Sequence, residues 1–340
     1  MKKNKEFRES FWEMVEEAED VVITGHIGPD DDSVSSVLAV YWLIRDRFPK
    51  KMIRMVCPGE TSDEWEYFEN FEKIKFVKEI TEVLFAEKKS LLIVLDGGSF
   101  DRFSKKPEKL KGLVNKTICI DHHGDEPDNF DLLHISPSYS STAEAIYRLL
   151  VEDDGKVPKR LAEIFLLGIL GDTGNFSYLN KDNAKVLEIV QKLIFENEIS
   201  IQKLQSKYIH YSKRILMLVG EMISNTKYFD GVGSCPAFQV GIFSREFLDK
   251  YSFSDEEISR ASHLYMSHYL GSVKKYDWGM SITPRKNGVC GLSFRSLPGV
   301  VNVRKVAEKF NGGGHDLASG GEVKVESSEK ALEIVLEQLK

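Results

Sequence analysis

Residues 20–36 read DVVITGHIGPDDDSVSS: a short apolar run, then glycine and histidine, then three consecutive aspartates. The run at Val21–Thr24 has the length and the β-branched content of a buried strand. A helical pattern follows from about Ser33 to Arg47. A buried strand that leads through a glycine-containing turn into a helix is typical of the first unit of a parallel α/β sheet.

The same alternation of strands and helices continues outward from this stretch. Upstream, apolar residues recur at helical spacing over Phe7–Ala18. Downstream, strand-like runs occur at Met52–Val56, Leu91–Leu95 and Thr117–Ile120, and helical patterns at Thr142–Val151 and Arg160–Leu170. This order predicts a doubly wound parallel sheet, in which ligands bind beyond the carboxyl ends of the strands.

A charged helical pattern from Asn183 to Ser224 separates this half from a second set of elements. In that set we expect strands at Ala237–Phe243, Trp278–Thr283 and Val289–Phe294, and helices at Asp255–Leu270, Val303–Phe310 and Ser328–Leu339. We therefore predict an α/β protein of two domains. A parallel-sheet domain would span 1–195, a helical connector 196–228, and a smaller α/β domain 229–340.

Four acidic or histidine-bearing clusters follow predicted strands or end a predicted helix. They are residues 25–32, Asp96 with Arg102 six residues later, Asp121–His123, and residues 171–176. Taken singly, each is most simply a helix cap, a loop charge or a solvated turn. Gathered at the ends of elements in one domain, the carboxylates would repel one another unless a cation matched their charge. Carboxylates with a few imidazoles suit Mn²⁺ or Mg²⁺, and two such ions ~3.5–4 Å apart would activate a hydroxide and polarise a phosphoryl group.

The second half carries a glycine-rich signal, NGGGH at residues 311–315, followed by ASGG at 318–321. Glycines let backbone N–H groups approach a phosphate closely, although a flexible turn would also explain them. The run lacks the G-x-G-x-x-G spacing of a dinucleotide site. Upstream, Arg295 ends a strand pattern, where it would either clamp a phosphate or lie as a surface charge.

The charge is unevenly distributed along the 340 residues, whose formal net charge is −7. Residues 1–200 hold 27 basic and 38 acidic side chains, whereas residues 201–340 hold 19 and 15, with a net +6 over 261–310. The acidic half argues against long nucleic acid or an anionic membrane as partner. The sequence has no membrane-span-length apolar run and no signal-peptide core, and its four cysteines are scattered, so we expect a cytoplasmic protein with reduced thiols.

These motifs, in this order, resemble the DHH phosphoesterase superfamily, in the branch with a C-terminal DHHA1 domain. Asp121-His122-His123 is similar to the motif that names the family. GHIGPDDDSVSS at 25–36 resembles its first motif, Asp96 with Arg102 its second, and DTGNF at 172–176 its fourth. SSTAE at 140–144, Arg295-Ser296 and GGGH with Ala318 are also similar, so the resemblance covers nearly the whole chain. Asp31 departs from the family pattern, which has glycine there.

The resemblance implies two Mn²⁺ ions, with Mg²⁺ or Co²⁺ as alternatives, and assigns roles to matching residues. One ion would be held by His26, Asp30 and a bridging Asp96. The other would be held by Asp32, Asp96, His122 and Asp172. His123 would face the scissile phosphate, Asp121 would orient His122, and Arg102 and Thr173 would support the site. The nucleotide would be bound by Arg295, Ser296, Gly312, Gly313, Gly314 and His315.

The two-domain layout resembles the stand-alone nanoRNase and 3′-phosphoadenosine-5′-phosphate (pAp) phosphatase branch. We therefore expect an Mn²⁺-dependent phosphodiesterase and exoribonuclease that degrades very short RNA to 5′-mononucleotides and converts pAp to AMP. A phosphodiesterase for cyclic-di-AMP or linear dinucleotides is the alternative, and a catalytically inactive nucleotide sensor is the third hypothesis. The resemblance also implies a homodimer, although no apolar stripe in the sequence establishes one.

Overall fold

The computed structural model describes residues 2–60, 65–83, 89–110, 113–124, 126–152, 155–208, 211–285, 288–314 and 316–340. The chain divides into two compact units, Met1–His210 and Tyr211–Lys340. Each unit has its own hydrophobic core. The predicted site residue His315 lies outside the described residues.

The first unit is built on a six-stranded parallel sheet, which confirms the predicted fold class. Its strands are β1 (Asp20–Thr24), β2 (Met52–Pro58), β3 (Ile74–Val77), β4 (Ser90–Leu95), β5 (Lys116–Asp121) and β6 (Leu132–Ile135). They lie in the order β3-β2-β1-β4-β5-β6, and every neighbouring pair is parallel. The winding direction reverses between β1 and β4, which places a ligand crevice at their carboxyl ends.

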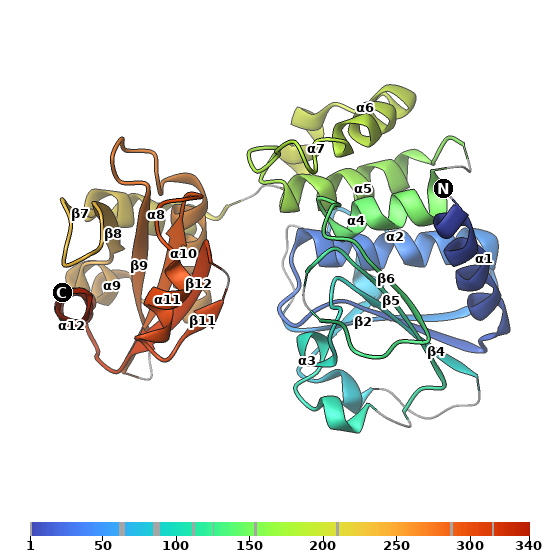
Figure 1. The fold of residues 1–340 in the computed structure, drawn as a ribbon, viewed down its shortest axis with the longest axis horizontal. Coiled ribbons are helices and arrows are strands. Elements are labelled where there is room, and N and C mark those ends of the chain that lie inside the picture. Colours follow the sequence, from blue (N-terminus) through green and yellow to red (C-terminus); the bar gives the residue numbers. More distant parts are fainter. Residues whose placement is uncertain are drawn as a thin grey trace. The chain divides into compact units, whose positions relative to one another are not determined.

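Side chains of the central strands alternate between two cores, as a sheet covered on both faces requires. In β1, Val21 and Ile23 face the larger core, whereas Val22 faces a smaller one. The larger core is covered by α1 (Lys2–Glu17), α2 (Asp31–Arg47), α4 (Thr142–Ile146, continued by a π-helical turn at Tyr147–Val151), α5 (Lys159–Asp172), α6 (Val186–Asn197) and α7 (Ile201–Tyr208). The short helix α3 (Phe100–Phe103) and 3₁₀ turns at Ile80–Glu82 and Pro107–Lys109 cover the opposite face (Figure 1).

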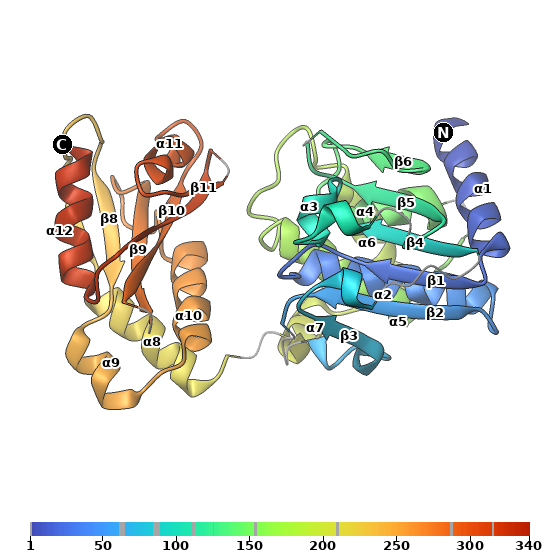
Figure 2. The same cartoon turned by 90° about the horizontal axis from the view of Figure 1, so that it is seen from below.

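The second unit is built on a six-stranded sheet in the order β11-β12-β10-β9-β8-β7. Its strands are β7 (Lys227–Phe229), β8 (Phe238–Ile242), β9 (Trp278–Arg285), β10 (Val289–Ser296), β11 (Gly313–Gly314) and β12 (Ala318–Val323). Only the β8–β9 pair is parallel among these described strands. Its helices are α8 (Lys213–Ser224), α9 (Arg245–Tyr251), α10 (Asp255–His268), α11 (Val303–Glu308) and α12 (Ser328–Leu339). Figure 2 shows α10 and α12 on opposite sides of this sheet.

Helices α7 and α8 follow one another in the chain but belong to different units. Leu204 of α7 packs in the first core, whereas Leu218 and Met222 of α8 pack in a core of the second unit. The domain boundaries at 195 and 229 stay predictions. Among the helices that the structure describes, none has both the length and the apolar composition needed to cross a membrane.

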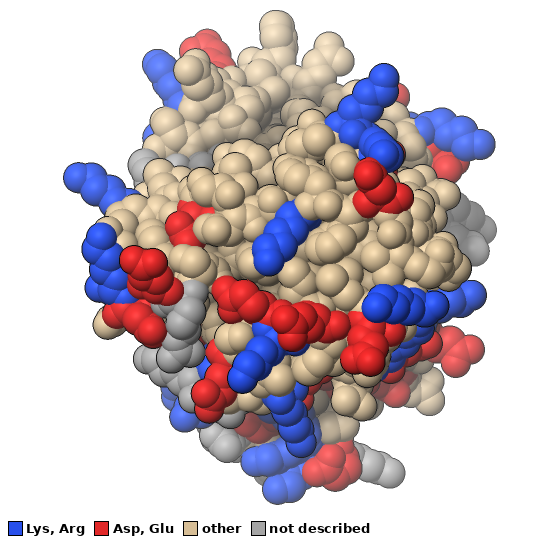
Figure 3. Space-filling model, turned by 90° about the vertical axis from the view of Figure 1, so that its left-hand side faces the viewer, with Lys and Arg blue, Asp and Glu red and all other residues tan. Residues whose placement is uncertain are grey.

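The basic excess over 261–310 is spread over several places among the described residues. Lys275 lies 2.7 Å from Asp230, and Arg304 lies 3.5 Å from Glu308. Arg285 lies at the opposite end of the β9–β10 hairpin from Arg295. On the face of the second unit in Figure 3, lysine and arginine side chains are dispersed among acidic ones. Arg285 and Arg295 are therefore too far apart to bind one phosphate together.

Candidate active site

The polar clusters predicted from the sequence meet at the carboxyl edge of the first sheet. His26 and Asp30 follow β1, Asp96 follows β4, Asp121 ends β5 and Asp172 ends α5. Parallel strands carry their carboxyl ends at one edge, so segments far apart in the chain come together there.

One group of potential metal ligands consists of His26, Asp30 and Asp96. The Nε2 atom of His26 lies 3.4 Å from Asp30 Oδ2 and 3.4 Å from Asp96 Oδ2. The other ring nitrogen, Nδ1, lies 3.0 Å from the carbonyl oxygen of Ile27. In the neutral ring, Nδ1–H donates to this carbonyl, so the Nε2 lone pair faces the two carboxylates. The three residues can each offer a ligand atom within 4.8 Å of the others.

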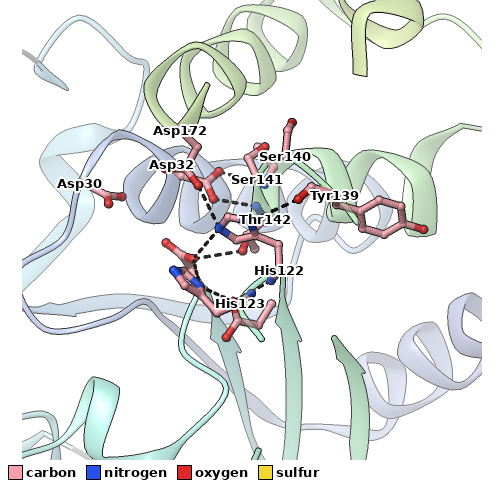
Figure 4. A network of polar contacts seen from close by, with 12 residues as sticks. Asp30, Asp32, His122, His123, Tyr139, Ser140, Ser141, Thr142 and Asp172 are labelled. Carbon is pink, nitrogen blue, oxygen red and sulfur yellow. Dashed lines mark hydrogen bonds and ion pairs between the residues drawn. The ribbon is translucent and has the colours of Figure 1, made fainter. Parts of the chain in front are cut away.

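A second group consists of Asp32, His122 and Asp172, which also offer ligand atoms within 4.8 Å of one another (Figure 4). The Nε2 atom of His122 lies 2.9 Å from Asp172 Oδ2 and 3.7 Å from Asp96 Oδ1. Asp96 therefore faces His26 with one oxygen and His122 with the other. The structure places Asp96 between the two groups, as a shared ligand requires.

The donor set fits divalent metal ions. The Nε2 atom of His122 is buried and forms no hydrogen bond with any described residue, although Asp172 Oδ2 is 2.9 Å away. A buried imidazole nitrogen that faces carboxylate oxygens without aligned hydrogen bonds is suited to sharing a cation with them. Carboxylate oxygens and imidazole nitrogens are both ligands of divalent metal ions in proteins.

The pKa values of these groups reflect an excess of buried negative charge. Burial raises the pKa of Asp32 well above its usual value, and the neighbouring Asp172 and Asp96 raise it further. Burial also raises the pKa of Asp172. Burial opposes protonation of the histidines, but the surrounding carboxylates outweigh it and raise the pKa of His26 to about 9 and that of His122 to about 10. A bound divalent cation would relieve the same repulsion.

The start of α4 holds two of the carboxylates in place. The backbone N–H groups of Thr142 and Ala143 donate to Asp32, at 2.6 Å to Oδ2 and 2.9 Å to Oδ1. The hydroxyl of Thr142 donates to Asp96 Oδ1 at 3.2 Å. The sequence analysis compared SSTAE with the family but gave Thr142 no role of its own. A threonine at the start of the helix predicted for 142–151 was the available signal, whereas in the structure the helix is capped by Ser141, which accepts the N–H of Glu144.

Asp121 holds His123 rather than the side chain of His122. Its Oδ1 atom lies 2.8 Å from His123 Nδ1 and accepts the backbone N–H groups of both histidines. Its Oδ2 atom accepts the N–H of Gly98 at 2.6 Å. Burial opposes ionisation, but the hydrogen bonds from His123 and Gly98 outweigh it and lower the pKa of Asp121 to about 2. The expectation that Asp121 orients the ring of His122 is corrected, because Nδ1 of that ring faces the carbonyl of Tyr139 at 3.4 Å.

Arg102 and Thr173 lie beside the site, each in contact with one of its segments. Arg102 Nη2 lies 3.3 Å from His123 Nε2, and the Arg102 carbonyl accepts the N–H of Ile27. The hydroxyl of Thr173 donates to the carbonyl of Ile169 at 2.5 Å and accepts the N–H of Phe176 at 3.2 Å. Thr173 therefore ends α5 and shapes the loop directly after the carboxylate at 172.

The backbone is unusual at Asp96 and ordinary at Asp31. Asp96 has a φ of +62°, in the left-handed region that costs most non-glycine residues about 1 kcal/mol or more. Such strain at the central carboxylate is typical of a functional position. Asp31, by contrast, is the first residue of α2 and has no positive φ, so replacement of the family glycine creates no strain.

The predicted nucleotide-binding residues that the structure describes lie at one end of the second sheet. Arg295 pairs with Ala318, and Gly313 and Gly314 form β11 against β12. The guanidinium of Arg295 donates to the carbonyl of Phe294, and the Ser296 hydroxyl donates to the carbonyl of Leu297.

Glycine at position 312 allows a close backbone approach. A Cβ atom on Gly312 would lie 1.9 Å from the carbonyl oxygen of Gly320. Gly314 has a φ of +136°, which glycine alone adopts readily. The glycine run is therefore in part a short strand, where the sequence suggested only a loop.

The fold and the residues of the site are those of a phosphoesterase, and two family models match the chain. The model of the DHH family N-terminal domain matches residues 20–169, and the DHHA1 domain model matches residues 267–340. The chain belongs to the DHH phosphoesterase family, in the branch with a C-terminal DHHA1 domain, and is a hydrolytic enzyme.

Individual relatives are similar over most of the chain. It is 27% identical over 307 residues to the bifunctional oligoribonuclease and PAP phosphatase NrnA of Bacillus subtilis, with 89% of each chain covered. It is 26% identical to the cyclic-di-AMP phosphodiesterase PdeA of Listeria monocytogenes, over 89% of this chain and 44% of that protein. A crystal structure of an exopolyphosphatase-related protein from Bacteroides fragilis matches with a TM-score of 0.82 and 25% identity, covering 98% of this chain and 96% of that one.

Proposed function

We propose that this protein is an Mn²⁺-dependent phosphoesterase that hydrolyses very short oligoribonucleotides to 5′-mononucleotides and pAp to AMP. One observation carries the proposal: six aspartate and histidine side chains form two ligand groups around a shared Asp96 at the carboxyl edge of the sheet. The similarity to the Bacillus subtilis enzyme, over nine-tenths of both chains, supports the substrate class.

We assign one ion to His26, Asp30 and Asp96, and the other to Asp32, Asp96, His122 and Asp172. Two divalent ions at such a centre activate a water molecule and neutralise charge on a phosphoryl group. The protein keeps the shared carboxylate in position through the Thr142 hydroxyl and keeps Asp32 in position through two amides of α4.

His123 is proposed to act on the phosphoryl oxygens. Its Nδ1 atom is occupied by Asp121, so Nε2 is the atom left to face a substrate, with Arg102 beside it. Burial opposes its protonation, but Asp121 and Asp96 raise the pKa of His123 to about 9. In the proposed reaction Nε2–H would donate to an oxygen on which negative charge develops, while Asp121 holds Nδ1.

The second unit is proposed to bind the nucleotide through Arg295, Ser296 and the glycine segment 312–314, together with His315. Arg295 would contact a phosphate, since guanidinium groups pair with phosphate oxygens through two hydrogen bonds. All four cysteines are free thiols, which supports the predicted cytoplasmic location. The homodimer stays a prediction.

A cyclic-di-AMP phosphodiesterase is the second candidate. The observation that favours it is the similarity to PdeA, which extends over 89% of this chain. The same ligand groups would serve this reaction, so the distinction lies in how the nucleotide is bound.

A product assay tests the proposal directly. Dinucleotide RNA, pAp and cyclic-di-AMP are incubated with the full-length protein under one Mn²⁺ condition, and parallel reactions contain Mg²⁺ or Co²⁺. We expect 5′-mononucleotides from the RNA and AMP from pAp. Turnover of cyclic-di-AMP alone would favour the second candidate. Nucleotide binding without any turnover would support the sensor hypothesis and contradict both enzyme assignments.

A further inference from the structure

Asp31 replaces the family glycine in the first motif, and its side chain has a defined partner. The Oδ1 atom accepts a hydrogen bond from the indole Nε1–H of Trp65 at 2.7 Å. Asp31 stands between Asp30 and Asp32, which belong to different ligand groups. The hydrogen bond from Trp65 therefore restrains the short segment 30–32, which supplies one carboxylate to each ligand group.

Trp65 is held in place independently of Asp31. Its side chain is 5% exposed and lies in the larger core. The ring stacks on Phe76, with 6.4 Å between centroids and an interplanar angle of 9°, and meets Phe71 edge-on at 6.2 Å. A buried indole N–H requires an acceptor, and here the acceptor is a carboxylate of the first motif. The core thus fixes the donor, and the donor fixes Asp31.

Asp31 also contacts the segment that leads to Asp172. A Cβ atom on Gly171 would lie 2.7 Å from the Cβ of Asp31, so glycine at 171 permits this close packing. Asp31 therefore touches the residue directly before Asp172 while it is bonded to Trp65. Its side chain joins the first motif, the fourth motif and the aromatic core.

We propose that Asp31 and Trp65 are positioning residues of the metal centre. Their hydrogen bond holds the turn of Asp30 and Asp32 in a ligand-ready geometry and so increases metal affinity. This inference rests on the proposed function for the presence of the metal centre. Asp31 belongs to neither of the two ligand groups around Asp96 among the described residues, so the role proposed for it is to position the ligands.

The size of the effect follows from the behaviour of other outer partners of metal ligands. Removal of such a partner typically lowers metal affinity about 10- to 100-fold. Asparagine at position 31 would keep an oxygen acceptor for the indole N–H but would lose the charge. Phenylalanine at position 65 would keep an aromatic ring in the core but would lose the donor. Asp31→Asn therefore separates the effect of the hydrogen bond from that of the charge. Trp65→Phe separates the effect of the hydrogen bond from that of aromatic packing.

The test is direct Mn²⁺ binding to the metal-stripped full-length protein, measured by electron paramagnetic resonance of the free ion. Trp65→Phe and Asp31→Ala should each weaken Mn²⁺ binding about 10-fold, and their combination should weaken it no further. Asp31→Asn should stay within about threefold of the parent protein. Trp42→Phe is the matched control, because it removes an indole hydrogen bond to the carbonyl of Glu69 elsewhere in the same core and should leave Mn²⁺ affinity unchanged.

Three results would overturn the inference. Trp65→Phe could bind Mn²⁺ as tightly as the control, Asp31→Asn could be as weak as Asp31→Ala, or the double variant could show additive losses. The second result would mean that Asp31 acts through its charge or as a ligand. Thermal unfolding of each metal-stripped variant shows that it is folded. If the parent protein itself binds no Mn²⁺, the metal centre of the proposed function fails; if it binds and the variants do not differ, only this inference fails.

Discussion

The two units bury different kinds of polar side chain. Among the described residues, every buried carboxylate lies in the first unit, at Asp20, Asp32, Glu79, Asp96, Asp121 and Glu144. The buried polar side chains of the second unit are all uncharged: Gln239, Ser262, Ser281, Thr283, Ser296, Ser319 and Ser328. Burial of a charge is costly unless the charge is matched, so the first unit carries a concentration of matched charge that the second lacks.

The partners of the buried carboxylates separate structural from catalytic positions. Asp20 pairs with Arg54, and Glu144 pairs with Arg148, so permanent cations satisfy these two groups. Asp96 instead faces three histidines at the sheet edge. Imidazoles can exchange protons for metal ions, whereas guanidinium groups cannot. The candidate metal site is therefore distinguished by histidine partners in place of arginine partners, and not by burial of the carboxylate alone.

The largest expected effect comes from the shared carboxylate. Asp96→Asn should lower turnover of dinucleotide RNA at least ~10³-fold, because both ligand groups lose one ligand. The metal-free variant should stay folded, because asparagine tolerates the left-handed backbone and keeps an oxygen acceptor for the Thr142 hydroxyl. Activity assays and denaturant unfolding measure the two effects. Activity within tenfold of the parent protein would contradict the assignment of Asp96.

His123→Ala should lower kcat about 10²- to 10³-fold while Mn²⁺ affinity stays within about threefold. The reason is that Asp121 holds Nδ1 of His123 and Nε2 is assigned to the substrate. His123 also forms a third group of possible ligands with Asp96, Asp121 and His122, so metal affinity is the measurement that separates the two roles. His26→Ala is the matched comparison, and it should lose Mn²⁺ affinity. Equal losses of metal affinity in both variants would show that His123 is itself a ligand.

Arg295→Ala tests the second unit, whose buried polar side chains are uncharged, as the nucleotide-binding part. The KM for dinucleotide RNA should rise about 10-fold with kcat little changed, because a charge-assisted contact to phosphate is lost. A minimal phosphate ester should be hydrolysed as before. Arg285→Ala removes a cation from the other end of the same hairpin and should leave KM unchanged. Similar KM values for both variants would remove Arg295 from the binding site.

The smallest effect on the metal centre is expected from Gly312→Ala, which adds a side-chain atom against the backbone of β12. The new Cβ would lie 1.9 Å from the carbonyl of Gly320, so the second unit should lose about 2 kcal/mol of unfolding free energy. Gly313→Ala is the control, because its Cβ would meet no atom within 4 Å. Mn²⁺ binding should be unchanged in both, and calorimetric unfolding measures the difference. Equal stability of the two variants would argue against the close β11–β12 approach.

The strands that the sequence analysis predicted are more deeply buried than those that it missed. The apolar runs of β1 and β4 are buried along their whole length and could be predicted from composition. The edge strands β3 and β6 are mostly half-buried, with mixed composition, and were missed. Strand β12 was missed as well, because ASGG within it is typical of a turn. An edge or glycine-rich strand is stabilised by its neighbours rather than by its own hydrophobicity.

The sequence by itself determined the chemistry of the site: which residue types are present, after which strands they come, and in what order. Those features are local, because a buried strand and the polar residue that ends it are adjacent in the chain. Only the tertiary structure decided the partners, such as Asp121 with His123, Thr142 with Asp96, and Trp65 with Asp31. The last two pairs join segments distant in the chain, and the first depends on side-chain direction at a strand end. Residue spacing carries neither kind of information, because both follow from how the strands and helices pack.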